Sequence, residues 1–169
     1  MSEAEPAYLI TGATGFLGRH ILSSLRRANS RARVVALVRN PAKWKGESWT
    51  REFPDVALVT GTLFDVDQWK NHPSLAKIEG IFHLAAIVKH SRQAPDEMIR
   101  VNVEGTANMV RLAADKKCRM LFASSSGVVG CSKDFRATPD EGAAYCDEVV
   151  AGWPYYASKI QKKDWFTAQ

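Results

Sequence analysis

Residues 8–18 read YLITGATGFLG, and this stretch decides the fold. An apolar, β-rich run is followed at once by Gly12, Gly15 and Gly18, and residues 16–28 have helical spacing. Glycines here permit a tight turn, a close backbone approach to a pyrophosphate and close packing of helix on sheet. Free N–H groups at the helix start bind the anion. The stretch predicts a strand, a phosphate-binding turn and a helix, with a glycine-rich turn lacking any ligand as the alternative.

Short β-rich runs alternate with helical stretches along the chain. The five runs predicted as strands are AYLIT at 7–11, RVVALV at 33–38, VALVT at 56–60, GIFHLA at 80–85 and RMLFAS at 119–124. This rhythm implies a parallel sheet with crossover helices. The second, fourth and fifth runs are almost continuously apolar, which predicts burial on both faces. The predicted fold class is α/β, a Rossmann-type doubly wound parallel sheet with helices on both faces.

A second long helix is predicted over residues 96–115, with two acidic residues at its start, where negative charge is favourable. Residues 41–53 and 127–153 lack a period and are predicted to be irregular, the second a long loop over the carboxyl edge of the sheet. No repeat or linker divides the chain. We therefore expect a single dinucleotide-binding domain over residues 1–169.

The composition is that of an ordinary soluble globular protein. The 169 residues are 46% hydrophobic and 24% charged, which excludes disordered and fibrous classes. No apolar run reaches the length of a membrane span, and the opening MSEAEPAYLI lacks the features of a secretory signal. The sequence thus predicts a cytoplasmic protein without a membrane partner.

The net charge of +5 would suit a nucleic-acid partner, but the basic residues are scattered rather than clustered. A modest positive field also suits a phosphate-bearing cofactor, and we expect no nucleic-acid partner. The four histidines show no metal-ligand spacing, so no metal site is predicted.

The end of the second predicted strand bears on the choice of cofactor. A dinucleotide fold that prefers NAD usually carries an acid there for the ribose 2′-hydroxyl. Here the sequence reads VRN at 38–40, and the guanidinium of Arg39 suits a 2′-phosphate. The prediction is NADP, with NAD as the alternative; an arginine after a strand is also ordinary surface.

Five motifs occur in an order that resembles the extended short-chain dehydrogenase/reductases. They are TGATGFLG at 11–18, HLAA at 83–86, NVEGT at 102–106, SSSGVVG at 124–130 and YYASK at 155–159. The resemblance covers residues 8–159 and is nearest to the dihydroflavonol-reductase and NAD-dependent epimerase/dehydratase branch.

The resemblance implies a catalytic set in which Tyr155 transfers a proton, Ser125 holds the substrate oxygen and Asn102 supports Lys159. Tyr155 and Lys159 are four residues apart and so share one face of a helix. Pro154 suits the first helical position. We expect the cation and the helix start to lower the pKa of Tyr155.

The resemblance also implies a set of cofactor contacts. They come from the glycine-rich turn, from the ends of the next three strands and from the catalytic pair. Thr62 occupies the place of a family carboxylate that meets adenine, and Ala85 and Ala86 are small enough for a close approach. The predicted contacts are Gly12, Thr14, Gly15, Phe16, Leu17, Gly18, Arg39, Thr62, Leu63, Leu84, Ala85, Ala86, Tyr155 and Lys159.

The implied activity is that of an NADP-dependent oxidoreductase, which transfers a hydride between nicotinamide and a carbonyl or alcohol of a small molecule. Two alternatives stay open: a nucleotide-sugar epimerase or dehydratase with bound NAD, and a dinucleotide-binding module without catalysis. Family members usually continue for well over a hundred residues more, so the resemblance implies truncation before the C-terminal substrate lobe. It also makes a homodimer plausible.

Overall fold

The computed structural model describes residues 5–90, 96–130, 134 and 136–160. The chain divides into two compact units. Unit 1 comprises Met1–Ala85 and Asn108–Phe122, and unit 2 comprises Ala86–Ala107 and Ala123–Gln169. The expectation of a single domain over residues 1–169 stays a prediction.

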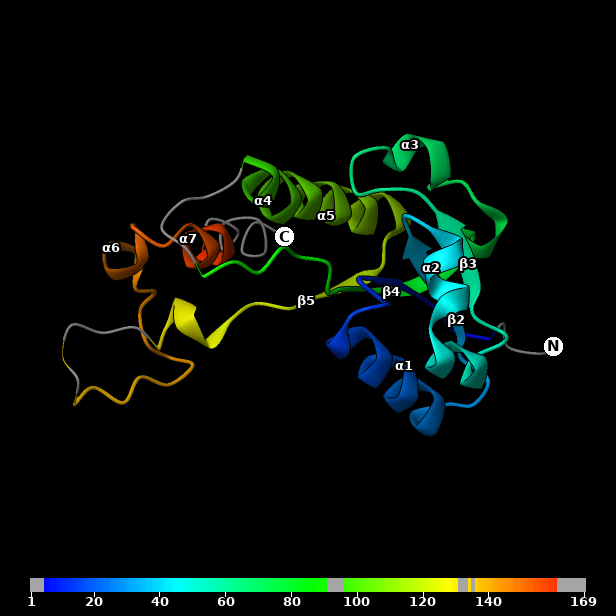
Figure 1. The fold of residues 1–169 in the computed structure, drawn as a ribbon, viewed down its shortest axis with the longest axis horizontal. Helices are drawn as coiled ribbons and strands as arrows, with labels where there is room; N and C mark the ends of the chain where they lie inside the picture. Colours follow the sequence, from blue (N-terminus) through cyan, green and yellow to red (C-terminus); the bar gives the residue numbers. More distant parts are fainter. Residues whose placement is uncertain (1–4, 91–95, 131–133, 135, 161–169) are drawn as a thin grey trace. The chain divides into compact units, whose positions relative to one another are not determined.

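Unit 1 contains a five-stranded parallel sheet, which confirms the predicted α/β Rossmann-type fold (Figure 1). The strand order is β3-β2-β1-β4-β5, so the direction of winding reverses between β1 and β4. The strands are β1 (Ala7–Thr11), β2 (Arg33–Val38), β3 (Ala57–Thr60), β4 (Ile78–His83) and β5 (Arg119–Phe122). All five predicted runs overlap a strand, although β4 begins two residues before the predicted run.

Helices connect these strands. They are α1 (Phe16–Ala28), α2 (Pro41–Gly46), α3 (Val66–Trp69) and α5 (Gly105–Lys116), with 3-10 turns at Ser48–Glu52 and Pro73–Leu75. Figure 1 shows α1 and the part of α5 in unit 1 on opposite faces of the sheet. The prediction of an irregular segment at 41–53 was wrong. The Asn40 side chain caps α2 by accepting hydrogen bonds from the N–H groups of Ala42 and Lys43, and Pro41 occupies the first turn.

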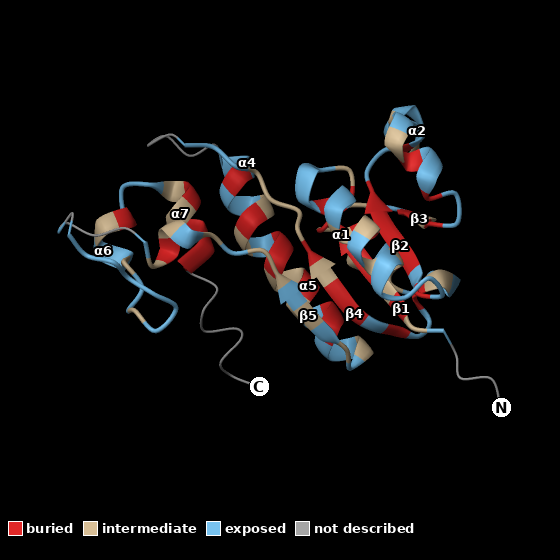
Figure 2. Cartoon of the chain, turned by 90° about the horizontal axis from the view of Figure 1, so that it is seen from below, coloured by how far each residue is buried: buried red, intermediate tan, exposed pale blue. Residues whose placement is uncertain are grey.

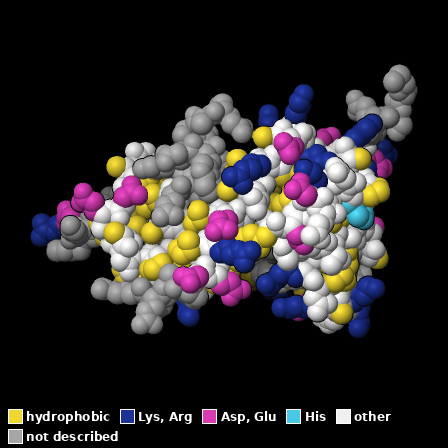
Figure 3. Space-filling model, turned by 90° about the horizontal axis from the view of Figure 1, so that it is seen from above, with side chains coloured by type: hydrophobic (Ala, Val, Ile, Leu, Met, Phe, Trp, Pro, Cys, Tyr) yellow, Lys and Arg dark blue, Asp and Glu magenta, His cyan; other side chains and the backbone are white. Residues whose placement is uncertain are grey.

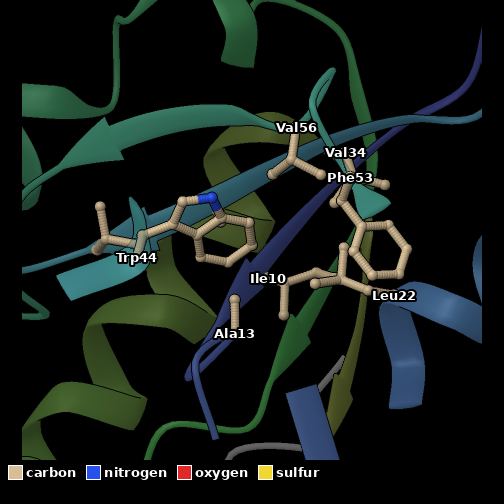
Figure 4. Close-up of a cluster of buried hydrophobic side chains, with 9 residues drawn as sticks. Ile10, Ala13, Leu22, Val34, Trp44, Phe53 and Val56 are labelled. Atoms are coloured by element: carbon tan, nitrogen blue, oxygen red, sulfur yellow. The ribbon is translucent and has the colours of Figure 1, made fainter. Parts of the chain in front are cut away.

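A hydrophobic cluster fixes α1 and the segment after β2 against one face of the sheet (Figure 4). Leu22 of α1 is fully buried and belongs to the same cluster as Ile10 of β1 and Val34 of β2. Trp44 and Phe53 close the cluster from the segment after β2. Each large side chain buried in this way contributes about 1.5–3 kcal/mol to folding.

Burial along the strands partly follows the sequence prediction. Five of the six residues of β2 are buried, as expected. For β5 the prediction of burial on both faces was wrong: its residues alternate between exposed and half-buried, and Leu121 is 51% exposed (Figure 2). The reason is topological, because β5 is the edge strand of the sheet that the described residues form, and β4 is its one neighbour there.

Unit 2 is built mainly from short helices. They are α4 (Asp96–Ile99), a π-helical turn (Arg100–Glu104), the start of α5, a 3-10 turn (Ser126–Val128), α6 (Asp147–Val150) and α7 (Pro154–Ile160). The helix predicted at 96–115 is therefore present but contains a π turn. Val128, Val150 and Ile160 form a small core. The prediction of an irregular segment at 127–153 was only partly right: the described residues between the 3-10 turn and α6 carry no helix or strand, but α6 itself lies inside the predicted loop.

The described surface carries charges of both signs. On the face drawn in Figure 3, Lys and Arg side chains are interspersed with Asp and Glu. None of the helices in the described part of the chain combines the length and apolar character needed to cross a membrane.

Candidate functional site

The turn after β1 packs backbone against backbone. Gly12 has a φ of +73°, and a Cβ there would lie 2.7 Å from the amide nitrogen of Ala85. The N–H of Leu84 donates to the Thr11 carbonyl at 3.2 Å, and the N–H of Ala85 donates to the Thr11 hydroxyl at 3.3 Å. The turn thus joins the carboxyl ends of β1 and β4, and the two backbones lie so close that only glycine fits at position 12.

Two further glycines shape the entry into α1. A Cβ at Gly18 would lie 2.5 Å from the Gly12 carbonyl oxygen, so the first turn of the helix rests directly on the loop. The N–H of Gly15 donates to the same carbonyl at 3.0 Å. Gly12 and Gly18 therefore each exclude a side chain for a separate structural reason.

The N-terminus of α1 is suited to an anion. No side chain caps the helix, and its first turn contains no acidic residue, so its first N–H groups lack the usual side-chain acceptor. Thr14 is half-buried, while Phe16 and Leu17 are 73% and 45% exposed. The first backbone N–H groups of α1 therefore fit a pyrophosphate at the helix start.

The carboxyl ends of β2 and β3 are adjacent. The N–H of Gly61 donates to the Val38 carbonyl at 3.1 Å, so Arg39 and Thr62 each follow a paired strand end. Arg39 is exposed. Leu63 is buried, and its carbonyl accepts a hydrogen bond from Asn108 at 2.8 Å.

Sequence reasoning missed a carboxylate beside Thr62. The backbone N–H and the hydroxyl of Thr62 donate to Asp65 at 2.6 and 2.7 Å. Burial acts to raise the pKa of Asp65, but the hydrogen bonds from Thr62 outweigh it and keep that pKa below its usual value. The sequence signal that could have drawn attention to Asp65 is its position directly before Val66, the first residue of a short helix.

Within unit 2, three of the predicted catalytic residues lie together. Tyr155 and Lys159 belong to α7, which begins at Pro154 as predicted, and are 9% and 5% exposed. The Ser125 side chain accepts a hydrogen bond from the Gly127 N–H at 3.3 Å and is close enough to Tyr155 to act on the pKa of its phenol. The Lys159 ammonium lies 5.8 Å from the centre of the Tyr155 ring and donates to the Ala123 carbonyl at 2.8 Å.

The expected lowering of the Tyr155 pKa is not found. Burial, followed by the neighbouring Tyr156, raises the pKa of Tyr155, and the effect of the neighbouring Ser125 only partly opposes this rise. Burial also lowers the pKa of Lys159 to about 8. The phenol is therefore held as the neutral acid, and the ammonium is destabilised beside it.

Asn102 is completely buried in the π turn rather than facing water. Its side chain accepts from the Ile87 N–H at 2.8 Å and donates to the Ile87 carbonyl at 2.9 Å, and it also donates to the Ser158 hydroxyl at 3.2 Å. One amide thus connects the segment after β4 with α7, which carries Lys159. Isolated π turns of this kind often accompany functional sites.

The predicted cofactor residues divide between the units. Ala86, Tyr155 and Lys159 belong to unit 2, and the others, from Gly12 to Ala85, belong to unit 1. Among the residues the structure describes, no group of three or more His, Cys, Asp or Glu side chains is placed to hold a metal ion.

Comparison with known proteins identifies the family. A profile described as "NAD dependent epimerase/dehydratase family" matches residues 8–168. The chain belongs to this family. Its curated relatives include a UDP-N-acetyl-alpha-D-glucosaminuronate decarboxylase from Bacillus cytotoxicus, 32% identical over 89% of this chain and 46% of the relative. Dihydroflavonol 4-reductase from Hordeum vulgare is 29% identical over 89% of this chain and 45% of the relative.

Solved structures agree on the fold. The UDP-glucose-4-epimerase from Stenotrophomonas maltophila, solved with bound NAD and formylated UDP-arabinopyranose, superposes with a TM-score of 0.75 at 20% identity. The match covers 96% of this chain and 48% of the epimerase. The chain spans about half the length of the curated relatives it matches.

Replacement of Asn102 by Ala is expected to release the segment after β4. Both backbone groups of Ile87 lose their partner, which costs about 2–4 kcal/mol. Hydrogen exchange at the Ile87 amide should become at least about tenfold faster. Asn108→Ala, which instead removes the hydrogen bond to Leu63, is the matched control; unchanged Ile87 exchange in Asn102→Ala would contradict the assignment.

The buried Lys159 predicts a defined pH dependence of stability. Below pH 8 the lysine is protonated in both states, so burial of the charge disfavours folding. Between about pH 8 and 10.5 the folded state releases this proton and the unfolded state keeps it, so the penalty is relieved as pH rises. Relative to Lys159→Met, the wild type should gain roughly 1–3 kcal/mol across this window, measured by urea unfolding. A pH-independent difference would rule this out.

Proposed function

We propose that this chain forms the cofactor-binding portion of an NADP-dependent oxidoreductase that transfers a hydride between nicotinamide and a carbonyl or alcohol. The observation that carries the proposal is the set in unit 2. Ser125 acts on the pKa of the Tyr155 phenol, and the Lys159 ammonium lies 5.8 Å from the centre of the Tyr155 ring. Asn102 supports α7 through Ser158.

Unit 1 supports the dinucleotide part of the proposal. The uncapped start of α1 offers N–H groups to the pyrophosphate, and Gly12 and Gly18 allow the backbone to come close. Family membership and relatives solved with NAD favour a pyridine dinucleotide over other phosphates. The cofactor would supply or accept the hydride.

Side chains of the protein would then transfer the proton and hold the substrate oxygen. Because its pKa is raised, Tyr155 holds its proton at neutral pH, which suits a proton donor for carbonyl reduction. Ser125 lies beside that phenol and would hold the same substrate oxygen. Lys159 would stabilise the phenolate left after proton transfer, and this gain exists only once the charge has formed.

Arg39 favours NADP over NAD. Arg39 follows the end of β2 and is exposed. In folds that prefer NAD an acidic residue occupies this position, and such a residue would repel a 2′-phosphate. A guanidinium can bind phosphate through two parallel hydrogen bonds. The Thr62 turn holds the carboxylate of Asp65, which would repel a phosphate, so we assign the 2′-phosphate to Arg39 rather than to this turn.

A nucleotide-sugar epimerase or dehydratase with bound NAD is the second candidate. Two observations favour it: the family profile itself and the 32% identity to a decarboxylase named for a UDP-sugar acid. Cofactor that stays bound through purification would support this alternative, since such enzymes regenerate it in each cycle. A dinucleotide-binding module without catalysis, the homodimer and the cytoplasmic location stay predictions.

Replacement of Tyr155 by Phe tests the catalytic assignment. The variant should bind NADPH as the wild type does and lose at least about 10²-fold in turnover, because the proton donor is gone. Binding is measured by quenching of tryptophan fluorescence and turnover by NADPH oxidation with a panel of carbonyl compounds. Tyr145→Phe, which removes an exposed phenol of unit 2, is the control; a fully active Tyr155→Phe protein would refute the role.

Replacement of Arg39 by Gln tests the cofactor preference. Loss of a charge-assisted contact should weaken NADPH binding about tenfold and leave NADH binding unchanged. Arg51→Gln removes another exposed arginine of unit 1 and is the matched control. If Arg39→Gln weakens both dinucleotides equally, the arginine does not read the 2′-phosphate.

A further inference from the structure

His83 is a fully buried imidazole in unit 1 that takes no part in the proposed proton transfer. It is the last residue of β4, and its register partners are Thr11, the last residue of β1, and Phe122, the last residue of β5. Register partners on neighbouring strands present their side chains on the same face of a sheet. The exposed fraction is 0% for His83 and 1% for Thr11. The three strand ends thus form a row at the carboxyl edge, beside the turn at Gly12.

Contacts with both neighbours in this row fix the imidazole ring. The ring stacks on that of Phe122, with ring centres 6.0 Å apart and an angle of 24° between the planes. Its Nδ1 lies 2.7 Å from the Thr11 hydroxyl oxygen. The same oxygen accepts a hydrogen bond from the Ala85 N–H at 3.3 Å. The Thr11 hydroxyl therefore connects the imidazole with the backbone that the Gly12 turn contacts.

The direction of the hydrogen bond between Thr11 and His83 follows from the protons available. The Thr11 oxygen is the acceptor toward Ala85, because a backbone amide can only donate. In the part of the chain that the structure describes, the Thr11 hydroxyl makes no hydrogen bond besides those with Ala85 and Nδ1 of His83. If Nδ1 carried a proton, the hydroxyl proton would be buried without an acceptor, which is costly. Nδ1 is therefore the acceptor, and the neutral ring carries its proton on Nε2.

We propose that His83 is a positioning residue for the dinucleotide-binding turn, and that it acts by presenting an unprotonated Nδ1 to Thr11. Oriented by this acceptor, the Thr11 hydroxyl keeps its oxygen toward the N–H of Ala85. The Ala85 nitrogen is the atom that a Cβ on Gly12 would meet at 2.7 Å, and the Gly12 carbonyl accepts the Gly15 N–H at the entry to α1. The inference deepens the proposed function and rests on it for the identity of the ligand.

Replacement of His83 by Asn or by Leu separates positioning from packing. The Oδ1 of Asn is two bonds from Cβ, as Nδ1 of His is, so Asn keeps an acceptor for Thr11, whereas Leu fills the site with apolar atoms. His83→Asn should bind NADPH within about threefold of the wild type, and His83→Leu about tenfold more weakly, because a buried hydrogen bond is lost. Tryptophan fluorescence quenching measures both affinities.

A purely structural role of His83 predicts the opposite order, because a buried amide costs more free energy than a buried Leu side chain. Tighter NADPH binding by His83→Leu than by His83→Asn, or equal binding by the two, would therefore overturn the proposal.

Substitutions at Thr11 test the same hydrogen bond with the imidazole in place. Thr11→Val keeps the shape of the side chain but lacks the hydroxyl, so it should weaken NADPH binding about tenfold, and Thr11→Ser should largely preserve binding. Adding His83→Leu to Thr11→Val should cost little more, because the hydrogen bond is already absent. If the two losses instead multiply to about a hundredfold, the residues act independently and the proposal is wrong.

The tautomer of His83 is observed by nitrogen NMR on the whole chain without any dinucleotide. Long-range proton–nitrogen spectra of the wild type should show Nδ1 unprotonated and Nε2 protonated, with the signals assigned through His83→Asn. Hydrogen exchange at the Ala85 amide should become about tenfold faster in Thr11→Val and in His83→Leu. A protonated Nδ1 in the wild type, or unchanged Ala85 exchange in both variants, would contradict the positioning role.

The two proposals can fail separately, because the tautomer and the amide exchange are measured without NADPH. A chain that shows the expected tautomer and exchange but binds neither NADPH nor NADH contradicts only the proposed function. A His83→Leu protein that binds NADPH and reduces carbonyls as the wild type does contradicts only the role of His83.

Discussion

The contact of Gly12 with the chain at Leu84 and Ala85 is the constraint on which the rest of unit 1 depends. At this point two backbones meet at a distance that excludes a Cβ, and the turn has a positive φ. The contact joins β1 to the end of β4 while the same turn starts α1. Because the helix also rests on the loop at Gly18, its first N–H groups are held uncapped at the carboxyl edge of the sheet. This packing leaves the start of α1 suited to an anion such as a phosphate.

In unit 2 the corresponding element is a buried amide rather than a glycine. Asn102 satisfies both backbone groups of Ile87 and reaches Ser158 on α7. A polar side chain with no exposed surface is stable only when its hydrogen bonds are made, so it selects one arrangement of these segments. On that support α7 buries Lys159 and Tyr155, and burial moves both pKa values toward the neutral forms. The pKa values of the pair therefore depend on its environment and not on its spacing alone.

Much of the fold could be predicted because it depends on local pattern. The apolar runs located five parallel strands, and the glycine spacing located the turn and α1. The misses have physical causes. Residues 41–53 lack a long period, yet the Asn40 cap and Pro41 are sufficient to start α2. The apolar content of β5 predicted full burial, but burial also depends on neighbours, and this edge strand has one.

The candidate site likewise combines features that the local sequence predicts with features that depend on distant residues. The four-residue spacing predicted that Tyr155 and Lys159 share a helical face, and the proline at 154 predicted the start of α7. Three further features depended on residues far apart in the chain or on the course of a loop: the pairing of Asn102 with Ile87, the folding of Asp65 back onto Thr62 and the approach of His83 to Thr11. By itself the sequence determined the periodic elements and the glycine turn, since these follow from the preferences of neighbouring residues. Only the tertiary structure decided burial, hydrogen-bond partners and pKa shifts, because these depend on which distant groups displace water around a side chain.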